Sequence, residues 1–154
     1  MDYTKQIQEI ASKLFAEGKI DLFIGYKHNL ADQNQVPLLI TDPADIPNLI
    51  FTERSVFNLV NYLKFEHTRN KRIGLVVKGC DSRALNLMLT ECQVKREKVY
   101  VVGICCDGVL NEKGEKAQNC EECVMPDPVV YDELLGTSRG KKNYVVNYIS
   151  FIHG

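Results

Sequence analysis

The middle of the chain carries two strand-like apolar runs that flank an amphipathic helical pattern. Residues 72–78 and 98–104 are apolar in their interiors, and residues 81–92 place apolar side chains at helical spacing. A strand, a helix and a second strand in this order form a βαβ unit, whose two strands run parallel in nearly all cases. Strands of a parallel sheet are buried on both faces, which explains the continuous apolar runs. We therefore expect an α/β fold with a mainly parallel sheet, built around the βαβ unit 72–104.

Further segments complete the expected single domain. We expect a helix at 7–15 capped by Thr4 and stopped by Gly18, strands at 21–26 and 37–41, a helix from about Thr52 to Lys64, and a helix that begins at Asp127-Pro128 and ends at Gly136. The helix at 52–64 would bury Val56, Leu59, Val60 and Leu63. The expected organisation is an α/β domain over 1–136, followed over 137–154 by a linker and an apolar tail that docks on the domain or on a partner.

Chain length and charge exclude several classes of protein. The 154 residues, 45% of them apolar, suffice for one globular domain with its own core. The 19 basic and 20 acidic side chains give a net charge of -1, so no basic surplus indicates binding to nucleic acid or to an anionic membrane. The longest apolar runs are too short to span a membrane, and the amino terminus has no signal-peptide core. We expect a cytoplasmic protein with no membrane span and no nucleic-acid partner.

Cysteine is the unusual component of this composition. The sequence holds six cysteines, and the cytoplasm keeps thiols reduced, so structural disulfides are not expected. Some of these cysteines should then bind a metal or take part in redox chemistry. Several lie in residues 105–127, a long polar stretch without a periodic pattern, and a loop of that length is usually functional. We expect a bound metal, rather than apolar side chains of its own, to order this loop.

Two cysteines follow the two strands of the βαβ unit. Cys80 lies where the first strand ends and the helix begins, and Cys106 lies just past the end of the second strand. Both positions fall on the carboxyl edge of a parallel sheet, where open α/β sheets place their ligands. Neighbouring strands are about 4.8 Å apart, so the two sulfurs can approach each other. The amides at the helix start should lower the pKa of the Cys80 thiol and favour a thiolate ligand.

The long loop supplies a further pair, Cys120 and Cys123, in the spacing Cys-x-x-Cys. Two cysteines from the sheet edge and this pair make four thiolates, a set that suits zinc or an iron–sulfur cluster. Four basic residues flank the cysteines and would offset thiolate charge or steer an acidic partner, although solvated surface is the simpler interpretation for the last two: Lys78, Arg83, Lys113 and Lys116.

The remaining two cysteines have simpler interpretations. Cys92 lies near the end of an amphipathic helix and is expected to be buried as a small apolar residue. Cys105 adjoins Cys106, and adjacent residues in extended chain point to opposite sides. Only one of the two can therefore face Cys80, and Cys105 in place of Cys106 stays open as an alternative ligand.

Three motifs carry a resemblance to a known family. They are Val77-Lys78-Gly79-Cys80-Asp81-Ser82-Arg83, the Cys106-x-Gly108 turn, and Cys120-x-x-Cys123 followed by Pro126-Asp127-Pro128. With these motifs and the segment 17–26, the sequence resembles the beta-subunit family of deazaflavin (coenzyme F-420) hydrogenases and dehydrogenases. It looks most similar to that family's branch of iron–sulfur electron-transfer proteins, which accompany heterodisulfide reductase-like, hydrogenase and formate dehydrogenase subunits. The resemblance covers about residues 7–136, and the cysteine spacing is its most specific part.

The resemblance implies one 4Fe-4S cluster held by Cys80, Cys106, Cys120 and Cys123. It also implies an iron–sulfur electron-transfer component of an oxidoreductase complex, a non-catalytic or accessory subunit whose partners are other flavin- or iron–sulfur-bearing redox subunits. Branch members commonly continue into a ferredoxin region, whereas this sequence ends at Gly154, so the next electron carrier is expected on another chain. Family beta subunits that reduce the deazaflavin also bind FAD, but no flavin site maps onto specific residues here.

Two other functions fit the same cysteines. In a zinc-stabilised protein-interaction module, the four sulfurs would only hold the long loop in place. In a dithiol redox protein, Cys120 and Cys123 would act alone, although such pairs normally lie at a helix start after a strand. Metal content separates the three functions, since iron with sulfide, zinc, and no metal are expected respectively.

Overall fold

The computed structural model describes residues 2–31, 34–106, 108–110, 113–116 and 127–136. Within these residues, six strands make up the sheet: β1 (Leu22–Lys27), β2 (Val36–Ile40), β3 (Leu49–Ile50), β4 (Ile73–Lys78), β5 (Val99–Ile104) and β6 (Glu133–Leu135). The same residues form the α-helices α1 (Thr4–Ala16) and α2 (Gly79–Thr90) and the short 3-10 helices η1 (Pro43–Asn48), η2 (Leu59–Lys64), η3 (Glu66–Thr68) and η4 (Arg96–Lys98).

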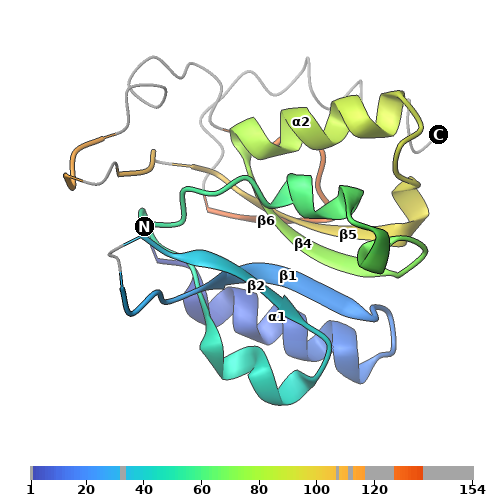
Figure 1. The fold of residues 1–154 in the computed structure, drawn as a ribbon, viewed down its shortest axis with the longest axis horizontal. Coiled ribbons are helices and arrows are strands. Elements are labelled where there is room, and N and C mark those ends of the chain that lie inside the picture. Colours follow the sequence, from blue (N-terminus) through green and yellow to red (C-terminus); the bar gives the residue numbers. More distant parts are fainter. Residues whose placement is uncertain (1, 32–33, 107, 111–112, 117–126, 137–154) are drawn as a thin grey trace.

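The sheet is parallel at its centre. Its strand order is β2-β1-β4-β5-β6, and β3 pairs with β1 beside this path. β4 runs parallel to β1 and to β5, and β6 runs parallel to β5, while β2 and β3 are antiparallel to β1. In Figure 1 the strands lie between α1, at the bottom, and α2, at the top. The expected α/β fold with a mainly parallel sheet is confirmed, and β4, α2 and β5 form the expected βαβ unit.

The first helix follows the predicted pattern closely. α1 buries the apolar side chains that recur at helical spacing: Ile7, Ile10, Ala11 and Leu14. Thr4 is the first residue of the helix and not its cap as predicted; Tyr3 occupies the N-cap position without a side-chain cap bond, and Asp2 Oδ1 accepts a hydrogen bond from Thr4 N–H at 3.0 Å. Gly18 stops the helix as predicted, with a φ of +65° that favours glycine.

The helix expected at 52–64 is wrong over its first half. The chain is irregular up to residue 58 and forms only η2 after it. Gln35 Nε2 donates a hydrogen bond to Thr52 Oγ1 at 2.7 Å, and Ser55 Oγ donates to Gln35 Oε1. These side-chain bonds fix a conformation that competes with helical backbone hydrogen bonds. Val56 is half-buried, whereas the apolar side chains of η2 are buried as predicted: Leu59, Val60 and Leu63.

The helix expected at 127–136 is also wrong, because this segment packs on the βαβ unit and ends as a strand. Its last part is β6, which pairs with β5. Asp132 Oδ2 accepts a hydrogen bond from a backbone N–H of β5 at 2.7 Å, and Val129 N–H donates to Ser82 Oγ at 2.8 Å. The polar groups of the segment are thus satisfied by β5 and α2, and not by a helix of its own. Gly136 ends the segment with a φ of +92°.

Apolar side chains on both sides of the sheet form the core, whose largest fully buried aromatic residues are Tyr26, Phe23 and Phe51. Within the described residues, no helix combines the length and apolar character that crossing a membrane requires. The linker and tail expected at 137–154 lie outside the described residues, so the docking of that tail stays a prediction.

Candidate metal centre

Two of the predicted ligands, Cys80 and Cys106, lie at neighbouring strand ends on the carboxyl edge of the sheet. The last residues of β4 and β5, Lys78 and Ile104, are paired in register, and each cysteine follows its strand end by two residues. Cys80 is exposed in the first turn of α2, and Cys106 is half-buried in the turn after β5. The two thiols are close enough to interact electrostatically. The structure thus brings together the two cysteines that the parallel topology predicted to meet.

Each of these sulfurs has a defined hydrogen-bond partner. Gly108 N–H donates to Cys106 Sγ at 3.2 Å, and its φ of +102° is one that glycine adopts without strain. The Cys80 thiol donates to Asp81 Oδ1 at 3.6 Å. Hydrogen bonds to cysteine sulfur are among the factors that set the properties of iron–sulfur centres. In the Cys106-x-Gly108 turn, the sulfur thus accepts a hydrogen bond from the backbone.

The protonation of Cys80 differs from the prediction. Partial desolvation raises the pKa of the Cys80 thiol to about 11, and the adjacent Asp81 carboxylate acts in the same direction. The sequence predicted a lowered pKa from the amides at the start of α2. The pKa is thus raised and not lowered, because desolvation and the carboxylate outweigh Lys78, which favours the thiolate. A metal that binds here has to displace the thiol proton, as metal ions do when they bind cysteine.

The other cysteines occupy different surroundings. Cys105 is buried, its N–H donates to Leu135 O at 2.9 Å, and its Cβ lies against Gly136. Cys92 is exposed, so the prediction that it is buried is wrong. It follows the far end of α2 with a φ of +59°, which turns the chain out of the helix. Cys80 and Cys92 therefore lie at opposite ends of α2.

The predicted pair Cys120 and Cys123 lies outside the described residues. Within the residues that the structure does describe, no three histidine, cysteine, aspartate or glutamate side chains gather as a metal site. The full ligand set therefore stays a prediction.

A buried ion pair that no sequence pattern predicted lies directly beneath Cys80. The Lys78 and Asp81 side chains are only 2% and 3% exposed, and Lys78 Nζ lies 2.8 Å from Asp81 Oδ2. Lys78 Nζ also donates to Tyr26 Oη at 2.7 Å and to Phe57 O at 2.9 Å. Burial alone would lower the pKa of Lys78, but Tyr26 and Asp81 outweigh it and raise that pKa. Lys78 is thus a buried cation, so of its two expected roles it can offset negative charge at this edge but does not lie on the surface to steer an acidic partner.

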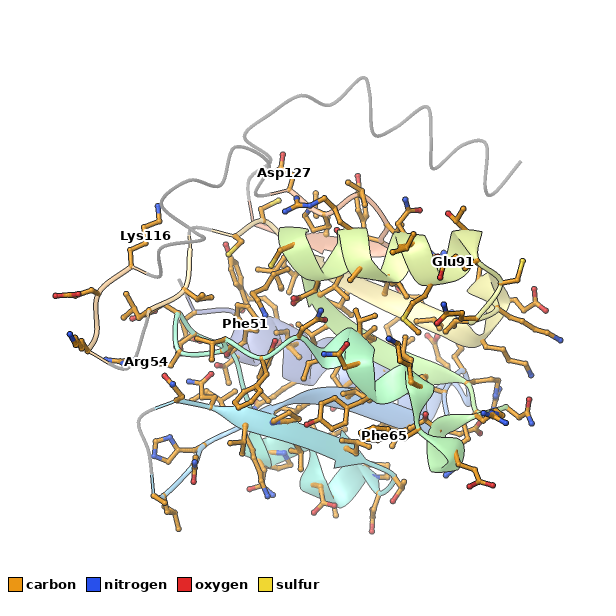
Figure 2. The ribbon with its side chains drawn as sticks, turned by 45° about the horizontal axis from the view of Figure 1, so that its top comes forward. Phe51, Arg54, Phe65, Glu91, Lys116 and Asp127 are labelled. Atoms are coloured by element: carbon orange, nitrogen blue, oxygen red, sulfur yellow. The ribbon has the colours of Figure 1, made fainter. Side chains whose placement is uncertain are left out.

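The segment that follows the long loop returns to this same edge. Ser82 Oγ, fully buried in α2, donates to Gly79 O at 2.8 Å and accepts from Val129 N–H at 2.8 Å. Pro128 packs on β5 so closely that a Cβ on Gly103 would lie 2.9 Å from Pro128 Cγ. Figure 2 shows Asp127 above the amino end of α2, with Glu91 at the other end. The chain therefore leaves the long loop beside the helix turn that carries Cys80.

The start of the long loop is held by protein contacts. Val109 is buried, and Leu110 N–H donates to Glu53 O at 2.8 Å. Leu110 forms a bridge with Lys116, which Figure 2 shows on the same side of the molecule as Arg54. Val109 is thus a buried apolar side chain in a loop that was expected to be ordered by a metal rather than by apolar side chains of its own. For residues 117–126, which lie outside the described residues, that expectation stays a prediction.

A hollow of about 450 Å³ lies at the opposite edge of the sheet, by the first residues of β4 and β5. Three of its basic side chains have acidic partners close by: Lys19 with Glu17, Arg72 with Asp21, and Arg96 with Asp132. Its positive charge is therefore largely neutralised, and the carboxyl edge remains the candidate site.

Comparison with known proteins finds distant sequence relatives and similar folds. No protein-family model matches the chain. The "F420-dependent formate dehydrogenase 1 subunit beta" of Methanococcus maripaludis is 22% identical over 100 residues, which cover 65% of this chain and 26% of that protein. A chain of the F420-reducing NiFe hydrogenase complex from Methanosarcina barkeri has a TM-score of 0.60 at 20% identity, over 70% of this chain and 39% of that one. The matched parts of these two chains share a fold.

These similarities agree with the resemblance drawn from the motifs at the level of fold and distant sequence similarity. By name, one protein is a subunit of a dehydrogenase and the other is a chain of a hydrogenase complex. The present chain spans about a quarter of the curated relative's length and under half of the solved chain. The activities and partners of those larger proteins enter here only as proposals.

Proposed function

We propose that this protein is an iron–sulfur electron-transfer component of an oxidoreductase complex. In this proposal one 4Fe-4S cluster is held by Cys80, Cys106, Cys120 and Cys123. The observation that carries the proposal is the convergence of Cys80 and Cys106 at adjacent ends of parallel strands. The names of the dehydrogenase and hydrogenase relatives support the redox role.

The donor set of the described residues fits such a cluster. Both donors are cysteine sulfurs, the ligands that iron–sulfur clusters use, and Gly108 adds a backbone N–H to the sulfur of Cys106. A cluster of this kind supplies a site that accepts and releases one electron. In the proposal the chain's own residues bind it, orient it toward the edge of the sheet, and set its electrostatic surroundings.

The length of the chain supports participation of the Cys-x-x-Cys pair. Val129 N–H is fixed 2.8 Å from Ser82 Oγ, two residues past Cys80. Cys123 is six residues before Val129, and six residues of extended chain span at most about 20 Å. Chain length therefore allows Cys123 to reach Cys80, because Val129 is held at the same edge of the sheet.

Serine variants test the ligand set. Replacing Cys80, Cys106, Cys120 or Cys123 singly by Ser is expected to abolish the broad visible absorbance of anaerobically purified protein. Cys92→Ser, an exposed cysteine at the other end of α2, is the matched control and should leave the absorbance unchanged. A normal cluster content in Cys80→Ser would contradict the assignment. A colourless protein that contains zinc would instead support the zinc-stabilised interaction module.

Redox assays test the role in a complex. The isolated protein is expected to take up and release one electron, yet to show no turnover with nicotinamide or deazaflavin coenzymes. Addition of a flavin- or iron–sulfur-bearing partner subunit should restore coenzyme reduction. Steady-state coenzyme reduction by the single chain with an artificial donor would refute the accessory role and indicate a complete enzyme.

A further inference from the structure

The buried pair of Lys78 and Asp81 needs an explanation beyond stability. A buried ion pair is often no more stabilising than well-packed apolar side chains of the same size, because both charges must be removed from water. This pair lies at the end of β4, in the turn that carries Cys80. Its position at the candidate metal centre points to an electrostatic role there.

The carboxylate of Asp81 is held with one oxygen toward the sulfur and the other toward the lysine. Oδ1 lies 3.6 Å from Cys80 Sγ and accepts the thiol hydrogen bond, and Oδ2 lies 2.8 Å from Lys78 Nζ. The negative end of the ion pair therefore faces Cys80, and the ammonium lies on the core side of the carboxylate. The carboxylate is thus the nearer of the two charges to the sulfur. When a metal displaces the thiol proton, the carboxylate acts on the sulfur through its charge alone.

The orientation of the pair is fixed by its other partners. The ammonium of Lys78 has three N–H donors, and three acceptors surround it: Asp81 Oδ2, Tyr26 Oη and Phe57 O. Asp81 Oδ2 also accepts the backbone N–H of Lys78 at 3.1 Å. A rotation that brought the ammonium toward the sulfur would break these bonds inside the core. These bonds therefore keep the negative charge of Asp81 beside Cys80 in the folded protein.

We propose that Asp81 is a positioning residue that lowers the one-electron reduction potential of the centre held by Cys80. Lys78, whose ammonium lies on the core side of the Asp81 carboxylate, partly offsets this lowering of the potential. The inference rests on the proposed function, because it requires a redox centre on Cys80. Each reduction adds one electron, and a fixed carboxylate within contact distance of a ligand sulfur opposes the added negative charge. Net charge is a known determinant of such potentials.

The test compares two substitutions of the same kind on one helix. Asp81→Asn removes the carboxylate charge at the amino end of α2, and Glu91→Gln removes one at the exposed carboxyl end. Ten helical residues correspond to about 15 Å, well beyond the screening length of about 8 Å at physiological salt. The readout is an anaerobic redox titration of the purified holoprotein with mediator dyes, followed by visible absorbance and electron paramagnetic resonance.

Asp81→Asn is expected to favour the one-electron reduced state by at least about tenfold, which corresponds to a shift of about 59 mV to more positive potential. Glu91→Gln should leave the potential at the wild-type value. Equal potentials for Asp81→Asn and wild type, at equal cluster content, would overturn the inference while leaving the proposed function intact. A wild-type protein without a cluster would instead refute the proposed function, and the inference with it.

A second variant covers the case in which the unpaired Lys78 prevents Asp81→Asn from folding. The double variant Lys78→Met/Asp81→Asn removes both charges and leaves neither one unpaired. Its potential is also expected to lie above the wild-type value, because the nearer charge of the pair is the negative one. If neither variant takes up the cluster although the wild type does, Asp81 serves assembly rather than potential, and the inference is overturned.

Discussion

Substitution of Lys78 by Met should be among the most destabilising single changes in this protein. The methionine keeps the apolar length of the side chain but removes the cation that pairs with Asp81 and binds Tyr26 Oη and Phe57 O. The Asp81 side chain, 3% exposed, is then a buried charge without its cation. Removal of one partner from a buried ion pair typically costs about 3–5 kcal/mol. That is a large part of the roughly 5–15 kcal/mol that stabilises a domain.

Urea unfolding followed by far-ultraviolet circular dichroism measures this loss. With a slope of about 2 kcal/mol per molar urea, the unfolding midpoint of Lys78→Met should fall by about 1.5–2.5 M. Lys13→Met makes the same chemical change at an exposed position of α1 and should change the free energy of unfolding by less than about 0.5 kcal/mol. A loss in Lys78→Met no larger than that in Lys13→Met would refute the ion-pair account.

The double variant with Asp81→Asn separates the pair from its surroundings. Each single change leaves one buried charge behind, whereas the double variant leaves none. The loss in Lys78→Met/Asp81→Asn should therefore be smaller than the sum of the two single losses by at least about 1 kcal/mol, within the range found for residues in direct contact. Additive losses would show that the two side chains do not stabilise each other.

Three further substitutions test other parts of the structure by the same unfolding measurement. Ser82→Ala should cost about 1–3 kcal/mol, because it removes the acceptor of Val129 N–H and a buried donor; a loss under about 0.5 kcal/mol would contradict the role of this hydroxyl. Gly103→Ala should cost about 1–3 kcal/mol, because the new methyl group would crowd Pro128. An unchanged stability would show that residues 127–136 shift to accommodate the methyl group. Arg72 lowers the pKa of Asp21 to about 2, so Asp21→Asn should lose under about 1 kcal/mol at pH 7, since this pair is exposed. That loss should vanish as the pH falls from about 4 to 2, and a loss independent of pH would argue against the pair.

The centre of the fold could be predicted because its signal is local in the sequence. Continuous apolar runs around an amphipathic segment determine β4, α2 and β5, and their parallel register follows from the connection. The same logic placed Cys80 and Cys106 at one edge of the sheet. Long-range contacts explain why the two predicted helices at 52–64 and 127–136 do not form as expected. Gln35 binds Ser55 from another part of the chain, and β5 pairs with β6 in the segment after Asp127. Periodicity and capping residues contain no information about such partners.

The burial of Lys78 likewise depends on long-range partners that local sequence patterns do not reveal. A lysine at the end of a strand ordinarily reaches solvent, and Lys78 is buried because Tyr26, 52 residues away, and the Phe57 carbonyl surround it. A weak signal was present in the spacing of Lys78 and Asp81, three residues apart across a strand-to-helix turn. The exposure of Cys92 also depends on tertiary structure, since its left-handed φ turns it out of the apolar stripe of α2.

The metal content of anaerobically purified wild-type protein tests the central claim most directly. We predict about four iron and four acid-labile sulfide per chain, the composition of one 4Fe-4S cluster, in a brown protein that bleaches on one-electron reduction. One zinc per chain in a colourless protein, or a protein free of metal, would contradict the assignment of Cys80 and Cys106 to an electron-transfer centre.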